Sequence, residues 1–160
     1  MGDKKILSEN IDFQNAYARL YEELGTCKKM VLSTSLDNVV TSRMMSIVIL
    51  NERFYFQTDK TFRKYRQLKE NGNVSLCIDN IEIEGYCEEA GIPLENAEFA
   101  NAYKKSFPGS YERYTSLKNE RLFVISPVFI KRWLYIHEVP YIETFDIRNK
   151  RYRLVQYQGE

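Results

Sequence analysis

Four basic residues crowd the start of one predicted helix. They are Lys60, Arg63, Lys64 and Arg66. Cations at a helix N-terminus oppose the helix dipole, which favours negative charge there. A bound phosphate would remove this conflict, because free backbone N–H groups, the dipole and the basic side chains would all attract it. A solvated basic face would contain the same residues, so both interpretations stay open on this segment alone.

A further basic residue, Arg43, occupies an unusual position on a predicted strand. Two-residue alternation puts it on the same face as Met45, so a charge stands on an otherwise apolar face. A ligand anion would satisfy this charge. A carboxylate from the acidic strand would also do so, and the candidates are Glu82, Glu84 and Glu88.

Most metal and nucleophile chemistries lack the residues that they need. His137 is the only histidine, which leaves no convincing basis for a His-rich metal site or a Ser-His-Asp triad. Cys27, Cys77 and Cys87 are odd in number and form no CxxC pair, as is typical of reduced thiols. We therefore expect no metal site, and any redox chemistry would use a bound cofactor.

Hydrophobic periodicity predicts the elements that position these residues. Helical spacing after Asn10 and Asp12 indicates a first helix that ends at Gly25. Period-two alternation predicts strands joined by short polar turns, over residues 29–34, 40–50, 53–58, 74–79 and 81–88. Helices are predicted over residues 61–71 and after Pro93. Three β-rich segments follow, over residues 121–126, 129–135 and 151–157, with interruptions at Pro127 and Pro140.

These elements predict an α+β, mainly β fold. Many short antiparallel strands with a few peripheral helices indicate a single domain over residues 1–160, built on a barrel because closure removes exposed sheet edges. The net charge of +1 argues against nucleic acid as a partner. The chain has no apolar h-region at its start and no stretch of about 20 apolar residues, so we expect a cytoplasmic protein without a membrane partner.

In their order along residues 29–154, these segments resemble the FMN-binding split β-barrel family typified by pyridoxamine 5'-phosphate oxidase. The run Arg43-Met44-Met45-Ser46 resembles a strand whose residues contact the flavin ring and phosphate. Gln57-Thr58 resembles a residue pair that lies along the ribityl phosphate in this family. Arg63-Lys64 resembles a pair that binds the phosphate. By this resemblance the FMN-binding residues are Arg43, Met44, Met45, Ser46, Gln57, Thr58, Lys60, Arg63, Lys64, Asn80 and Trp133.

The resemblance also implies how two copies would share the cofactor. Members of the family form two-fold dimers with FMN in the interface. Asn80 would reach the ring from the partner subunit, and Trp133, in the pattern Pro-x-x-Ile-x-x-Trp, would lie beside the cofactor.

Two departures from the oxidase argue against pyridoxine phosphate as a substrate. Val48 stands where the oxidase has a lysine, and Phe107 where it has an arginine, so two cations for a substrate phosphate are missing. Tyr103 is retained. We predict that Tyr103, Phe107 and Tyr111 form the wall of a substrate pocket for a planar, uncharged molecule.

The sequence thus predicts an FMN-dependent oxidoreductase, similar to a flavin reductase, that acts on a small molecule with hydride from NAD(P)H or another reductant. Two alternatives stay open. One is a flavin-binding module without specific turnover. The other is a haem-binding barrel in which His137 is the axial ligand.

Overall fold

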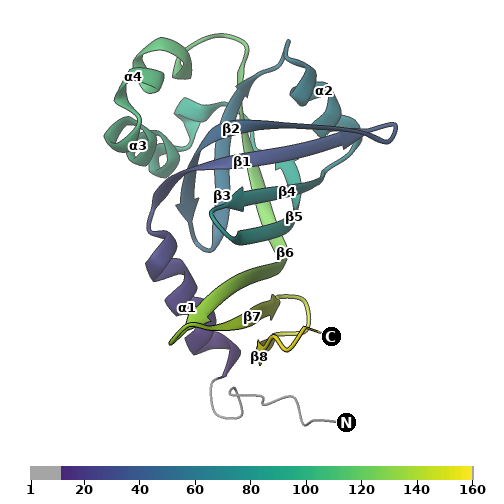
Figure 1. The fold of residues 1–160 in the computed structure, drawn as a ribbon. Helices are drawn as coiled ribbons and strands as arrows, with labels where there is room; N and C mark the ends of the chain where they lie inside the picture. Colours follow the sequence, from purple (N-terminus) through teal and green to yellow (C-terminus); the bar gives the residue numbers. More distant parts are fainter. Residues whose placement is uncertain (1–11, 160) are drawn as a thin grey trace.

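Six antiparallel strands close into a barrel in the computed structural model, which describes residues 12–159 (Figure 1). The ring runs β3-β2-β1-β4-β5-β6, and pairing of β3 with β6 closes it. Beyond the ring, β7 pairs with the second half of β6, and β8 pairs with β7. The strands are β1 Cys27–Leu36, β2 Val39–Leu50, β3 Arg53–Asp59, β4 Asn73–Ile78, β5 Ile81–Glu89, β6 Glu120–Ile136, β7 Val139–Asp146 and β8 Arg151–Gln156. This confirms the predicted mainly β barrel.

Helices lie around the barrel rather than within it (Figure 1). They are α1 Phe13–Leu24, α2 Arg63–Glu70, the 3-10 turn η1 Pro93–Glu95, α3 Ala97–Ser106, α4 Pro108–Ser110 and the π-helical turn η2 Tyr111–Thr115. The Asp12 carboxylate accepts a hydrogen bond from the Asn15 N–H and caps α1, and Gly25 ends it with a φ of 72°. The other predicted cap, Asn10, lies outside the described residues. No helix in the described range is long and apolar enough to span a bilayer.

The strand β6 differs from the prediction because it runs unbroken through Pro127. Pro127 pairs with Gly85 and Phe129 with Glu84, so Val128 is an extra residue on β6 at this point. Such a bulge accommodates a proline, which has no N–H to donate to the neighbouring strand. Pro140 likewise lies at the second position of β7, a strand that the sequence did not predict. Prolines are tolerated near the start of a strand.

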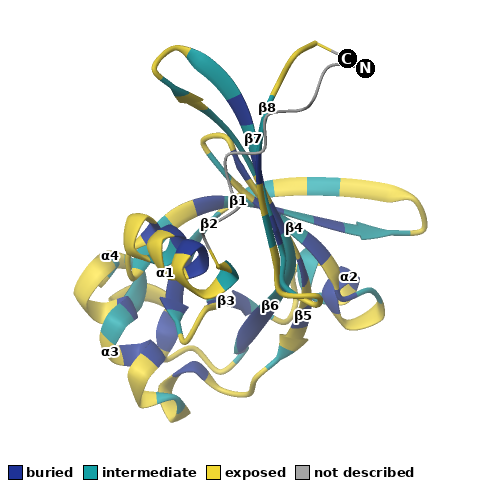
Figure 2. Ribbon diagram, turned by 90° about the horizontal axis from the view of Figure 1, so that it is seen from below, coloured by how far each residue is buried: buried dark blue, intermediate teal, exposed yellow. Residues whose placement is uncertain are grey.

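The apolar core has two parts. The larger one fills the barrel and includes Phe56, Leu76 and Phe123, with Leu20 of α1 packed against it. The smaller one lies where α3 packs, and its members are Val48, Phe99, Tyr103 and Leu122. Figure 2 shows the buried residues on the barrel strands and on one side of α1, whereas the projecting β1–β2 hairpin is largely exposed.

A polar cluster attaches α1 to the strands beyond the barrel. The Arg132 guanidinium forms ion pairs with Glu23 of α1 and, at 2.7 Å, with Glu143 of β7. The Tyr152 hydroxyl of β8 donates a 2.7 Å hydrogen bond to Glu143. Because Glu143 is buried, these partners supply the positive charge and hydrogen bonds that a buried carboxylate needs.

We predict that Gly85→Ala destabilises the barrel at the β5–β6 bulge. A Cβ at this position would lie 2.6 Å from the Ile125 side chain and 2.9 Å from the Ser126 carbonyl oxygen. Overpacking of this kind costs about 1–3 kcal/mol of unfolding free energy. Gly109→Ala is the matched control, because its Cβ would meet no atom within 4 Å. Urea unfolding of both variants checks this, and equal stabilities would contradict the packing argument.

Candidate functional site

Three basic side chains converge where α2 begins: Arg43 from β2, and Arg63 and Lys64 from the first turn of α2. Burial lowers the pKa of Arg43, and the positive charge of Arg63 lowers it further. Burial also lowers the pKa of Lys64, with a contribution from Arg43. Among residues 12–159, none of the three forms an ion pair with a carboxylate. Their mutual repulsion favours a bound anion.

Neutral acceptors hold the Arg43 side chain. The guanidinium donates hydrogen bonds to the Leu32 carbonyl at 3.2 Å, the Thr34 hydroxyl at 2.8 Å and the Thr41 hydroxyl at 2.5 Å. Both hydroxyls also donate to the Gln67 side-chain oxygen of α2, at 2.7 and 3.0 Å. The β5 carboxylates, which were the alternative partners, do not pair with it. Arg43 is therefore fixed in orientation while its charge stays uncompensated.

A cavity of about 350 Å³ lies between the end of β3 and the turns that follow α3, and one of these cations, Lys64, lines it. Its lining residues are Gln57, Thr58, Asp59, Phe62, Lys64, Tyr103, Tyr114, Leu117 and Glu120. Gln57 accepts a 3.0 Å hydrogen bond from the Thr115 hydroxyl, which fixes its amide. The buried Thr58 hydroxyl oxygen has no hydrogen-bond partner within the described part of the chain. A ligand oxygen at this place would satisfy it.

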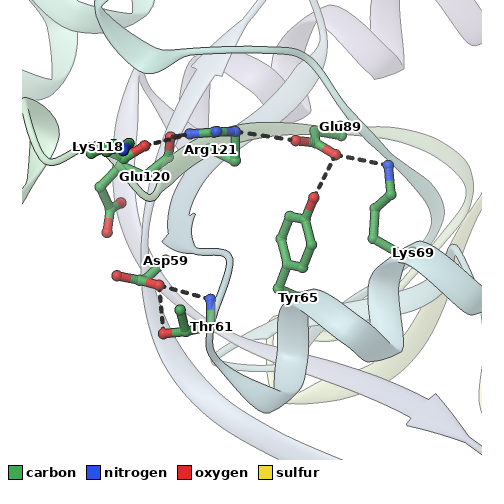
Figure 3. Close-up of polar contacts among 8 residues, drawn as sticks. All are labelled: Asp59, Thr61, Tyr65, Lys69, Glu89, Lys118, Glu120 and Arg121. Atoms are coloured by element: carbon green, nitrogen blue, oxygen red, sulfur yellow. Dashed lines mark hydrogen bonds and ion pairs between the residues drawn. The ribbon is translucent and has the colours of Figure 1, made fainter.

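Two carboxyl groups of the cavity lie directly opposite each other across β3 and β6. Asp59 pairs with Glu120 in the strand register, and their side chains point to the same side in Figure 3. The Thr61 hydroxyl and N–H donate to Asp59 at 2.6 and 2.7 Å and lower its pKa. Burial and the Asp59 charge raise the pKa of Glu120 to about 7. The environment thus separates the two acids into an ionised and a readily protonated group.

A second set of polar contacts fixes α2 against the barrel (Figure 3). The Tyr65 hydroxyl and the Lys69 ammonium donate to one oxygen of Glu89 on β5, at 3.0 and 2.8 Å. The other Glu89 oxygen lies 3.6 Å from the Arg121 Nε of β6. Since α2 contains Arg63 and Lys64, these contacts fix the helix that supplies two of the three cations.

The predicted substrate wall is only partly the wall of this cavity. Tyr103 lines it, whereas Phe107 and Tyr111 pack against the smaller core and are not among its lining residues. Tyr114 and Leu117, three residues apart in the turns after α4, line the cavity together with Tyr103. The sequence reasoning missed Asp59 and Glu120, because only closure of the barrel brings them together.

The remaining residues of the predicted flavin strand differ in exposure. Met44 is 60% exposed on the outer side of β2, and Met45 is half-buried against the larger core. Ser46 faces the Tyr103 hydroxyl, whose pKa is raised by burial. Lys60 is exposed, and its backbone N–H donates to the Asn119 carbonyl at 2.9 Å.

Asn80 and Trp133 form a separate pair at the other end of β5. The Asn80 amide donates to the Trp133 carbonyl, and the Trp133 N–H donates to the Asn80 carbonyl at 3.3 Å. The indole packs on Tyr157, with ring centroids 4.9 Å apart. Neither residue lines the cavity, and no hydrogen bond or ion pair in the described range joins this pair to Arg43, Arg63 or Lys64.

Neither the protein-family models nor the curated proteins contain a match to this chain. Solved structures do match it. A putative pyridoxamine 5'-phosphate oxidase from Listeria innocua is 16% identical with a TM-score of 0.57, and the match covers 73% of this chain and 97% of that one. A pyridoxamine 5'-phosphate oxidase-related, FMN-binding protein from Nostoc punctiforme is 13% identical with a TM-score of 0.54, over 82% and 87% of the chains. Campylobacter jejuni ChuZ is 11% identical with a TM-score of 0.69, over 95% and 65%.

The fold is that of the pyridoxamine 5'-phosphate oxidase-related proteins. On this split barrel, Val48, which replaces a lysine of the oxidase motif, is fully buried in the smaller core beside Phe99. Phe107 packs against the same cluster. The two positions at which the resemblance implied missing substrate cations are thus apolar packing positions.

We predict that Glu89→Gln loosens α2 in a pH-dependent way. Partial burial raises the pKa of Glu89, but the hydrogen bonds from Lys69 and Tyr65 outweigh it and hold the pKa below its ordinary 4.5. A lowered pKa stabilises the fold above pH 4.5, and this contribution disappears as the pH falls through the folded value. Glu89→Gln should lose about 1–2 kcal/mol at pH 7, and this loss should shrink towards pH 3.

Urea unfolding at several pH values measures this difference. The matched control is Glu88→Gln, because Glu88 is the exposed neighbour on the same strand. It should match the wild-type protein throughout. A deficit of Glu89→Gln that stays constant down to pH 3 would mean that the carboxylate charge does not hold α2.

Proposed function

We propose that this protein binds FMN, with the flavin phosphate on Arg43, Arg63 and Lys64. The observation that carries the proposal is the convergence of three cations without an ion-pair partner among residues 12–159. A phosphate monoester carries about −1.5 to −2 charge at pH 7, which is the complement of such a cluster. The structural similarity to an FMN-binding protein from Nostoc punctiforme supports the choice of ligand.

The residues around the cations fit a flavin in their chemistry. The buried Thr58 hydroxyl has no partner in the described range, so it is free to bond a phosphate or ribityl oxygen, and Gln57 lies next to it. Met45 and Ser46 continue along β2 from Arg43 and would border the ring. A cavity of about 350 Å³ is within the ~300–1,000 Å³ usual for ligand sites.

A second copy of the chain would complete this site. Asn80 and Trp133 do not line the cavity beside Lys64, so in this proposal they contact the flavin that is held by the other copy. On β2, only Val48–Leu50 pair with β3, which leaves the earlier part of that edge open. Val40 and Met44 are exposed there at 66% and 60%. Covering this apolar edge in a homodimer would bury it and bring the partner's residues to the flavin.

The activity that we propose is that of a cytoplasmic, FMN-dependent oxidoreductase acting on a small molecule, with NAD(P)H as a candidate reductant. A bound flavin would supply the electron chemistry. The side chains of Tyr103, Tyr114 and Leu117 form an apolar wall and would exclude water from a planar, uncharged substrate. The cysteines Cys27, Cys77 and Cys87 are free thiols, which suits a reducing compartment.

The double variant Arg63→Ala/Lys64→Ala tests the phosphate site. We expect folded protein that is largely free of flavin, because two of the three phosphate cations are removed. The measurement is the visible absorption of the purified protein, the mass of any released chromophore, and a fluorescence titration with FMN. Lys104→Ala/Lys105→Ala, which removes two exposed cations from α3, is the control and should bind FMN as the wild-type protein does.

Each other outcome points to a different function. Wild-type FMN affinity in the Arg63/Lys64 variant would show that the basic cluster is only a solvated face. A flavin-loaded protein that oxidises NAD(P)H no faster than free FMN, with every acceptor tried, would be a flavin-binding module. A haem spectrum that disappears on substitution of the exposed His137 would replace the flavin proposal.

A further inference from the structure

Glu120 is the one carboxylic acid of the cavity whose charge lacks a close partner in the described part of the chain. It begins β6, is only 6% exposed, and lines the cavity beside Thr58. In Figure 3 the dashed lines reach its backbone carbonyl but not its carboxylate. Ionising a carboxyl group in this mostly buried place is costly, so protonation of Glu120 is easier than protonation of an exposed glutamate.

The charged groups around Glu120 come from several elements. Asp59 of β3 lies directly opposite, and Thr61 keeps it ionised by two hydrogen bonds. Lys64 of α2 lines the same cavity and attracts the Glu120 carboxylate, but at more than the 4 Å of an ion pair. Burial raises the pKa of Tyr103, which also lines the cavity, so its hydroxyl adds no charge near neutral pH. Lys64 is thus the main group that stabilises ionised Glu120.

The neighbouring Arg121 does not offset this charge. Its guanidinium donates to the backbone carbonyls of Lys118 and Glu120, at 2.9 and 2.7 Å, and its Nε lies 3.6 Å from Glu89 (Figure 3). These contacts direct it to the other side of β6. The balance at Glu120 therefore depends on Asp59, which disfavours ionisation, and on Lys64, which favours it.

We propose that Glu120 is a further ligand-binding residue that acts in its protonated form, so that a dianionic phosphate monoester enters the cavity together with one proton. The inference rests on the proposed phosphate site. A phosphate dianion bound to Lys64 would neutralise the positive charge that stabilises ionised Glu120. Its own negative charge would also repel the Glu120 carboxylate. The protonated carboxyl is instead a hydrogen-bond donor, and it joins the unpartnered Thr58 hydroxyl in binding phosphate or ribityl oxygens.

Proton uptake is the direct test. FMN is titrated into flavin-free wild-type protein at pH 7.5 by calorimetry, in two buffers with different ionisation enthalpies. A net uptake of a large part of one proton is expected, because a carboxyl group with a pKa of about 7 is mostly but not fully ionised at pH 7.5, and this uptake should be lost in Glu120→Gln. The wild-type Kd for FMN should rise by up to about tenfold per pH unit between pH 7 and 9, because the FMN phosphate (pKa near 6) is already a dianion there. Glu120→Gln should give a nearly flat curve.

Two further variants test whether the pH dependence comes from Glu120 and not from the loss of any carboxylate. Glu88→Gln removes an exposed carboxylate from β5 and should keep the wild-type pH dependence. Asp59→Asn removes the charge that raises the pKa of Glu120, so the rise in Kd should begin at lower pH than in the wild-type protein. This second variant tests the inference even where Glu120→Gln does not fold.

The results separate this inference from the proposed function. FMN binding with the same proton uptake in wild-type protein and Glu120→Gln would overturn the role of Glu120 and leave the phosphate site standing. Failure of the wild-type protein to bind FMN would overturn the flavin proposal. In that case inorganic phosphate is the probe, and phosphate binding that strengthens as Glu120 becomes protonated, but not in Glu120→Gln, would still support the role of Glu120. A pH-independent response to phosphate would overturn it.

Discussion

Pairing of β3 with β6 is the contact on which the candidate site depends. These strands are more than sixty residues apart in the chain, yet their register places Thr58 opposite Arg121 and Asp59 opposite Glu120. The same pairing closes the six-stranded ring and removes two sheet edges. It also brings the end of β3, where α2 begins, to the end of β6 that follows the turns after α3. The cavity is therefore a product of barrel closure and not of any local motif.

Closure alone would not keep three cations together, because like charges repel in a partly buried place. Two polar networks offset that cost. One joins Thr34, Thr41 and Gln67 around the Arg43 guanidinium, and the other ties α2 to the barrel through Glu89. Both networks include side chains of α2. The helix that supplies two of the cations is thus held from two sides, which would reduce the cost of ordering the cluster around the proposed phosphate.

The periodicity of the sequence was enough to predict α1 and β1 to β5, because each alternates cleanly between apolar and polar residues or repeats at helical spacing. It failed at Pro127 and Pro140, where a bulge and a strand start accommodate prolines that usually interrupt strands. The basic residues of the site could be identified from charge patterning on β2 and α2. Glu120 could not, because the features that distinguish it are its burial and its cross-strand neighbour, and both arise only in the closed barrel.

The side chains near the two ends of β5 differ in chemical character. Near the Glu89 end the side chains are mostly charged: Lys64, Asp59 and Glu120 line a cavity whose wall also includes Tyr114 and Leu117, and Lys69 pairs with Glu89. At the Asn80 end, the surface is aromatic, with Trp133 packed on the exposed Tyr157. FMN contains groups that match both surfaces: a charged phosphate and a planar aromatic ring. In the proposed homodimer the charged end of one chain would face the aromatic end of the other, so that one flavin would contact both surfaces.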